Sequence, residues 1–161
     1  MKNLCAVFLF GAWMLVSAGT AQADKMVSKD AVLKAIEVFQ KDASSAEGVA
    51  AASTIMSFAK TNASVHLSLS KAVVPWLKAQ DAPDADTRGM LLTAYVAGNV
   101  RSQLASGKAS DDIYAGWQQV LATYAQLLQI NPAAKLSEVE ELKSKEMAGT
   151  LRAYSAEVLK K

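Results

Sequence analysis

Apolar residues recur every three or four positions along most of the chain, which is the spacing of an amphipathic helix. The first such stripe predicts a helix over residues 30–41. A second helix is expected to open at Ser44, which has capping-box spacing to Glu47, and to end near Asn62. The expected core positions of these two helices are Val32, Ala35, Ile36, Phe39, Val49, Ile55, Met56 and Ala59.

The stretch that follows does not obey one pattern. Val65, Leu67 and Leu69 alternate as in a strand, although a helical stripe also fits the same stretch. Pro75 forbids an uninterrupted helix but is favourable in a first helical turn. We therefore expect an irregular, partly buried connection, followed by a short helix from Pro75 to about Gln80.

The next segment predicts the centre of the fold. A helix over residues 85–105 is expected, with Asp84 as its N-cap and Gly107 in a left-handed conformation at its end. Its middle is apolar almost all round, which is typical of a helix buried inside a bundle. The apolar residues are Met90, Leu91, Leu92, Tyr95, Val96, Val100 and Leu104.

Two further helical regions follow. One is expected to be capped by Asp111 or Asp112 and has a single apolar arc. The other opens at Ser137, which has capping-box spacing to Glu140, and is interrupted at Gly149. The apolar arc of the first region consists of Ile113, Trp117, Val120, Leu121, Tyr124, Leu127 and Leu128.

Residues 116–132, with the sequence GWQQVLATYAQLLQINP, resemble the second half of a tetratricopeptide repeat. Tyr124, Leu127 and Pro132 have the spacing of the positions that close such a repeat, but the first half of the motif is missing and no period of about 34 residues is visible. An amphipathic core helix that ends at proline is therefore the alternative. Residues 90–128 also resemble uncharacterised exported bacterial helical proteins, which implies a helical fold and an envelope location but no activity. We predict an all-α fold, either a compact bundle or a short TPR-like array of about six to seven helices.

The first 23 residues form a separate unit. Lys2 precedes an apolar run over residues 4–16, and small residues follow, which is the order of a secretory signal peptide. The run is short for a membrane span, although an uncleaved anchor is the alternative. We expect cleavage before Asp24, a single α-helical domain over residues 24–161, and a periplasmic or secreted location in a bacterium.

Composition limits the chemistry of the mature chain. Its only cysteine, Cys5, leaves with the leader, so that packing alone must stabilise the domain. Without Lys2, 17 − 1 = 16 basic residues face 15 acidic ones, which is no excess for binding nucleic acid. No second apolar run is long enough to cross a membrane, so no transmembrane segment is expected after cleavage.

No catalytic, metal or cofactor motif is visible. His66 is the only histidine, and one imidazole does not make a metal site, while the G-x-S-x-G motif of a serine hydrolase is absent. Asp81, Asp84 and Asp86 approach a calcium-loop spacing, but the twelfth position of that loop is Leu92 instead of glutamate. We therefore predict no enzyme, no metal and no cofactor.

Asn99 lies on an otherwise apolar helix face, and a buried amide must find partners. It could contact a ligand or partner in a groove, or it could bond the backbone of the adjoining turn near Asp111. Arg101, on another side, could pair with Asp111 or Asp112 or bind an anion. Gly98 indicates a close helix crossing.

The helix that follows has an unusual outer face. No charged residue occurs between Asp112 and Lys135, and the face consists of glutamine and alanine, which cost little to desolvate. Either the chain's own C-terminal helices or a second protein could cover it. The four glutamines are Gln118, Gln119, Gln126 and Gln129.

These features favour a non-enzymatic periplasmic module that binds another envelope protein. Three alternatives remain. The chain could be a small-molecule binding protein or a weakly marked hydrolase, both of which would use a pocket between helices, or it could be an envelope immunity or inhibitor protein. The pocket would be lined by Tyr95, Asn99, Tyr114 and Trp117. The candidate binding residues are Tyr95, Asn99, Arg101, Tyr114, Trp117 and Gln118.

Overall fold

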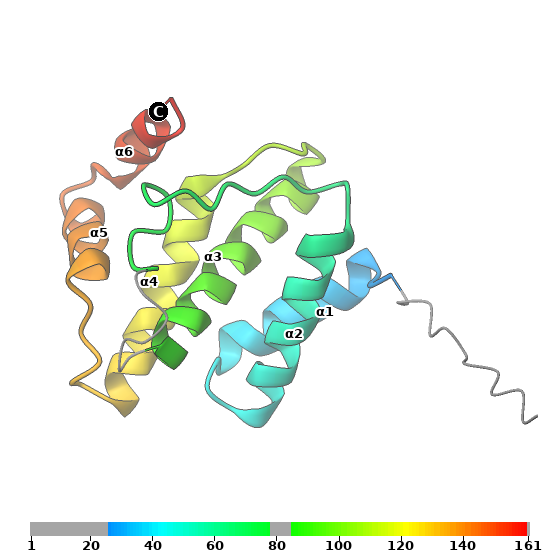
Figure 1. Cartoon of the computed structure of the whole chain (residues 1–161), viewed down its shortest axis with the longest axis horizontal. Helices are drawn as coiled ribbons and strands as arrows, with labels where there is room; N and C mark the ends of the chain where they lie inside the picture. The colour runs from blue at the N-terminus through cyan, green and yellow to red at the C-terminus, as the bar shows by residue number, and fades with distance from the viewer. Residues whose placement is uncertain (1–25, 78–84, 161) are drawn as a thin grey trace, which may run out of the picture.

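The computed structural model describes residues 26–77 and 85–160, and every regular element within these ranges is an α-helix (Figure 1). The predicted all-α bundle is therefore confirmed, while the predicted leader lies outside the described residues. The helices are α1 (Lys29–Lys41), α2 (Ala46–Thr61), α3 (Ala85–Ser106), α4 (Ile113–Ile130), α5 (Ser137–Met147) and α6 (Leu151–Val158).

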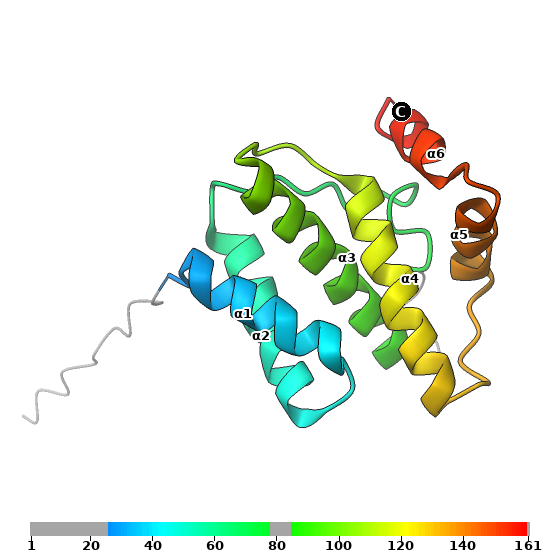
Figure 2. The same cartoon turned by 180° about the vertical axis from the view of Figure 1, so that it is seen from behind.

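Helix α3 occupies the middle of the bundle. It packs against α1 and α2 on one side and against α4 on the other, while α5 and α6 lie beyond α4 (Figure 1 and Figure 2). All residues from Thr93 to Val100 are buried, so this part of the helix is covered all round. A helix that is buried on all sides must lie inside the bundle, so the prediction of a central helix is confirmed.

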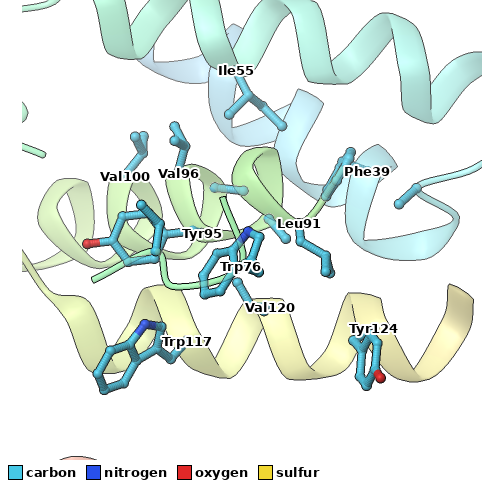
Figure 3. Packing of buried hydrophobic residues seen from close by; sticks show 14 of the residues in the cluster. Phe39, Ile55, Trp76, Leu91, Tyr95, Val96, Val100, Trp117, Val120 and Tyr124 are labelled. Carbon is cyan, nitrogen blue, oxygen red and sulfur yellow. The ribbon is translucent and has the colours of Figure 1, made fainter. Parts of the chain in front are cut away.

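The irregular connection between α2 and α3 belongs to the core. Its Trp76 is fully buried and meets Tyr95 of α3 edge-on, with ring centroids 6.5 Å apart (Figure 3). The indole N–H of Trp117 in α4 donates to the Val73 carbonyl at 2.7 Å. Burying a large apolar side chain contributes about 1.5–3 kcal/mol, so these aromatic contacts hold the connection in place without regular structure.

The short helix predicted from Pro75 does not form in its described part. Pro75 and Trp76 lie in a turn and Leu77 has no regular structure. The remaining residues of that prediction lie outside the described residues, as does the predicted Asp84 cap. The Val74 and Leu77 backbones are joined by a turn hydrogen bond of 3.0 Å. Burial of Trp76 at this point fixes the backbone more strongly than helix propensity does.

Helix α2 begins one residue later than predicted. Ser45, not Ser44, is the N-cap, and its hydroxyl accepts from the Gly48 N–H at 3.0 Å. Ser44 instead donates its hydroxyl to Asp42, which also accepts from the Ser44 and Ser45 backbones. Val49, an expected core position, is 56% exposed, contrary to prediction, because it lies on the side of α2 that faces away from the core. The buried residues of the helix are Gly48, Ala51, Ile55 and Phe58.

The predicted capping box of α5 is also wrong. Ser137 is the first helical residue, Leu136 takes the N-cap position, and no side chain caps the helix. Glu140 accepts from the buried Tyr124 hydroxyl at 3.0 Å, and that hydroxyl accepts from the Leu136 N–H at 2.9 Å. The carboxylate therefore serves a contact between α4 and α5 that local spacing does not reveal.

The predicted end of α3, both ends of α4 and the interruption at Gly149 are confirmed. Asp112 caps α4 by accepting from the Ala115 N–H at 3.0 Å, and Asn131 ends that helix. Gly107 and Gly149 have φ values of 67° and 70°, the left-handed region that glycine adopts without steric cost.

Candidate functional site

Asn99 is fully buried and satisfied within the fold. Its amide oxygen accepts from the Asp112 N–H at 3.1 Å, and its amide nitrogen donates to the Tyr95 hydroxyl at 3.2 Å and to the Asp111 carboxylate. The structure therefore agrees with the hypothesis that Asn99 bonds the adjoining turn, and not with the hypothesis that it contacts a ligand or partner. In this arrangement it does not face a groove.

Gln103 completes this network, and the sequence analysis missed it. Its amide oxygen accepts from the His66 N–H at 2.9 Å, while its amide nitrogen donates to the His66 carbonyl at 2.7 Å and to Asn99. Asp111 also accepts from the Ser68 N–H at 2.7 Å. The signal was present, because Gln103 follows Asn99 by four residues and so lies on the same helix face.

The Tyr95 hydroxyl is held as a hydrogen-bond donor. Burial raises its pKa, and the negative charge of Asp111 raises it further. The hydroxyl donates to that carboxylate at 3.0 Å. Tyr95 and Asn99 thus join α3 to the α3–α4 turn, and their polar groups are committed to the fold.

Trp117 and Tyr114 contact the C-terminal helices. Trp117 is fully buried and stacks on Tyr154 of α6, with ring centroids 5.4 Å apart. Tyr114 is half-buried, and the guanidinium carbon of Arg152 lies 4.0 Å from its ring centroid. Because Tyr95, Asn99 and Trp117 are all fully buried, the expected pocket between them and Tyr114 is filled by their own packing.

A groove of about 370 Å³ lies where α1, α3 and α4 meet. Its base is the crossing of α3 and α4, where a Cβ on Gly98 would lie only 2.4 Å from the Ala115 carbonyl oxygen. The prediction of a close crossing at Gly98 is confirmed. The lining residues are Gln40, Gly98, Arg101, Ser102, Ala105, Ala115, Gln118 and Gln119.

Arg101 does not pair with either aspartate of the turn. Its guanidinium donates to the Gln40 amide oxygen at 2.9 Å. Asp111 already accepts from Tyr95, and Asp112 accepts from Ser102 and caps α4. The carboxylates are therefore occupied by groups closer to them in the fold.

The side chains of Arg101, Gln40, Gln119 and Thr123 form a chain of hydrogen bonds, which we call the amide relay. The Gln40 amide nitrogen donates to the Gln119 amide oxygen, and the Gln119 amide nitrogen donates to the Thr123 hydroxyl at 3.2 Å. A guanidinium only donates, so Gln40 must turn its oxygen toward Arg101. The Gln40 amide nitrogen then points toward Gln119, so Gln119 must turn its oxygen toward Gln40 and its nitrogen toward Thr123.

The N-terminal helix, and not the C-terminal pair, covers Gln119 and Gln126 of the glutamine face. The Gln126 amide nitrogen donates to the Gln40 carbonyl at 2.8 Å, at the end of α1. Gln118 remains exposed and contacts α5 through a 3.1 Å hydrogen bond to Glu146. The alternative in which the C-terminal helices cover this face is therefore wrong for Gln119 and Gln126, and Gln118 and Gln129 stay exposed.

The described ranges, 26–77 and 85–160, hold no group of three His, Cys, Asp or Glu side chains placed to bind a metal. In the same ranges no helix combines the length and the apolar character that crossing a bilayer requires. Asp86, the only described member of the calcium-loop candidate, is exposed.

Together the fold and the groove define a helical bundle with one arginine and three glutamines on a shared surface of α1, α3 and α4. Comparisons with protein-family models, with curated proteins and with solved structures find no significant match to the chain. The resemblances to tetratricopeptide repeats and to exported bacterial helical proteins therefore stay predictions.

Proposed function

We propose that this chain is an exported, non-enzymatic module that binds a segment of another envelope protein in the groove between α1, α3 and α4. The single observation that supports it most is the lining of that groove. Side-chain amides both donate and accept hydrogen bonds, so the exposed amide of Gln118 suits the main chain of a bound segment whatever its sequence, while Gln40 and Gln119 bond each other. Arg101 and Gln118, two of the candidate binding residues, are exposed there.

The charge-free surface of α4 also supports a binding role. No Asp, Glu, Lys or Arg occurs in Ile113–Ile130, so a partner that covers this helix does not have to remove water from an ionised side chain. We include export in the proposal because Lys2 precedes an apolar run at the N-terminus, as in a secretory signal peptide.

Site-specific photocrosslinking in cells tests the proposal. A photoreactive residue replaces Ala105, which is exposed and lines the groove, and in a matched strain it replaces Ala50, which is exposed on α2. We expect an adduct of one discrete mass from the position of Ala105 and none of that mass from the position of Ala50. Equal adducts from both positions, or none from the groove, would contradict the proposed function.

A further inference from the structure

Of the residues that separate α5 from α6, only Gly149 leaves the right-handed helical region (Figure 1). Its φ is 70°, while its neighbours Ala148 and Thr150 are both right-handed, with φ values of −80° and −104°. Residues 137–158 contain no proline, so nothing else in this stretch forbids a helix. A change in the backbone of Gly149 to the right-handed region therefore suffices to join α5 and α6 into one continuous helix.

Gly107 shows how a glycine ends a helix elsewhere in the same fold. Its φ is 67°, but residues 107–112 form a connection without helical structure, and Asp112 then caps the next helix. Helix α6 has no such start. The Thr150 hydroxyl donates to the Lys145 carbonyl of α5 at 3.2 Å, and no side chain in the described ranges caps α6. The residues around Gly149 thus end α5 without starting an independent helix.

The apolar pattern of α6 continues backwards across the bend. Four apolar residues follow one another at intervals of four, three and four positions, which places them on one face of a continuous helix: Met147, Leu151, Tyr154 and Val158. In the bent form Leu151 and Val158 are buried, whereas Met147 is 82% exposed. The bend therefore interrupts an apolar stripe that the sequence carries through it.

Contacts between α6 and α4 hold the bent form. Tyr154 stacks on Trp117 with ring centroids 5.4 Å apart, and the guanidinium carbon of Arg152 lies 4.0 Å from the centroid of the Tyr114 ring. Lys145 of α5 adds to the bend, since its Nζ lies 4.4 Å from the centroid of the Tyr154 ring. We call the surface of α4 formed by Tyr114 and Trp117 the α6 seat. Neither of these two residues lines the groove between α1, α3 and α4.

We propose that Gly149 is a hinge through which two copies of the chain exchange α6. When Gly149 turns right-handed, α6 leaves its own α4 as the end of a continuous helix, and both the α6 seat and the apolar stripe lose their cover. A second open copy has the same two surfaces, so each α6 occupies the seat of the other copy with the contacts of the bent form. Any other protein would have to reproduce α6 to fit this seat, whereas a second copy already carries it. The exchange goes beyond the proposed function and does not depend on it.

Gly149→Ala and Gly107→Ala form a matched pair that tests the hinge in the full chain. At both positions the glycine has a left-handed φ, and an added Cβ meets nothing within 4 Å. Alanine disfavours the left-handed region by a factor of about 5 to 30 per chain, and both chains of an exchanged dimer escape this penalty at position 149. Gly149→Ala should therefore shift the midpoint of dimerisation to a protein concentration at least about 30-fold lower than in the wild type.

Size-exclusion chromatography with light scattering over a concentration series measures this midpoint. Gly107→Ala should associate like the wild type, because the connection that follows it does not become helical with one residue. Gly149→Asn should dimerise less than Gly149→Ala, since asparagine tolerates the left-handed region better than alanine does. Circular dichroism should show that the helix content of Gly149→Ala is at least that of the wild type.

Nuclear magnetic resonance of mixed samples distinguishes exchange from dimerisation through another face. Both copies carry Gly149→Ala, one copy is isotope-labelled, and the other carries a spin label at Ala156→Cys, an exposed position of α6. The label is unique in the mature chain, because the only native cysteine, Cys5, lies in the predicted leader. We expect the spin label to broaden the indole N–H signal of Trp117 in the isotope-labelled copy, as it does within one chain of the wild type.

Three results would overturn the inference. The first is a Gly149→Ala variant that stays monomeric throughout the concentration series, and the second is equal dimerisation of Gly107→Ala, because the association would then not come from the bend. The third is a dimer in which the spin label leaves Trp117 of the other copy unchanged. None of these measurements uses a residue of the groove, so failure of the proposed function would be seen separately, in the photocrosslinking from the position of Ala105.

Discussion

Gly89→Ala and Gly98→Ala lie in the same helix and should change the free energy of unfolding in opposite directions. Glycine inside a helix costs about 0.5–1 kcal/mol relative to alanine, because its unfolded backbone is more flexible. A Cβ on Gly89 meets nothing within 4 Å. Gly89→Ala should therefore stabilise the protein by about 0.5–1 kcal/mol.

At Gly98 the same gain in helix propensity is outweighed by steric overlap. The added Cβ would lie 2.4 Å from the Ala115 carbonyl oxygen and 2.8 Å from the Gln119 Cβ, whereas ordinary contacts start at 3.4 Å. The crossing would have to open by about 1 Å, and overpacking of this kind costs about 3 kcal/mol when backbone atoms are involved. Subtracting the propensity gain leaves a net loss of about 2 kcal/mol.

Urea and thermal denaturation followed by circular dichroism measure this difference directly. The two variants should differ by about 3 kcal/mol, which corresponds to about 10 °C in Tm for a domain of this size. Both carry the same chemical change in the same helix, so differences in composition cancel. If Gly98→Ala proved as stable as Gly89→Ala, the close approach of α3 and α4 would be refuted.

Three further perturbations test the polar network and the α1–α2 turn. Asn99→Leu should destabilise the protein by about 3–5 kcal/mol in urea denaturation, since it leaves the Asp112 N–H without its acceptor and removes a donor to a carboxylate. Gln103→Leu should speed amide hydrogen exchange around His66, whose N–H and carbonyl lose their partner, and unchanged exchange would contradict this role. Hydrogen bonds from Ser44, first from its side chain, hold the pKa of Asp42 below the ordinary 3.8, so Asp42 contributes stability fully above that pH and loses it as the pH falls through the lower folded value. Asp42→Asn should remove this acid dependence in denaturation series from about pH 2 to pH 5.

Helical periodicity predicted most of the fold because burial along a helix is a local property of the sequence. The stripe of α1 and the all-round burial of α3 needed no knowledge of the neighbours. Cap positions were less certain, since Ser44 and Ser45 offer the same hydroxyl one residue apart. The Asp42 carboxylate accepts from the Ser44 hydroxyl, while the Ser45 hydroxyl caps the helix. Such competition between side chains within one turn leaves no periodic signal in the sequence.

The partners of the buried polar groups were harder to predict than the groups themselves. The apolar face around Asn99 showed that its amide needs partners, but Gln103 and the His66 backbone come together only when the connection folds over α3. The same limit applies to Glu140. Its spacing from Ser137 predicted a capping box that does not form, and its hydroxyl partner, Tyr124, lies in another helix.

The uncharged face of α4 shows what an absence in a sequence can predict. It indicated that the face can be covered at little cost, because a buried ionised side chain needs a partner while an amide can be satisfied by another amide. The structure covers Gln119 and Gln126 in part and leaves Gln118 and Gln129 exposed. The absence of charge did not indicate which segment covers the face, since Gln40 lies 79 residues from Gln119 and nothing in their spacing links them. The amide nitrogens of Gln119 and Gln126 donate to Thr123 and to the end of α1, whereas the buried amide oxygen of Gln126 has no hydrogen-bond partner within the described ranges. Gln118 and Gln129 stay exposed on this face, and Gln118 lines the groove together with the exposed Arg101, so this pair is where a binding function can be tested.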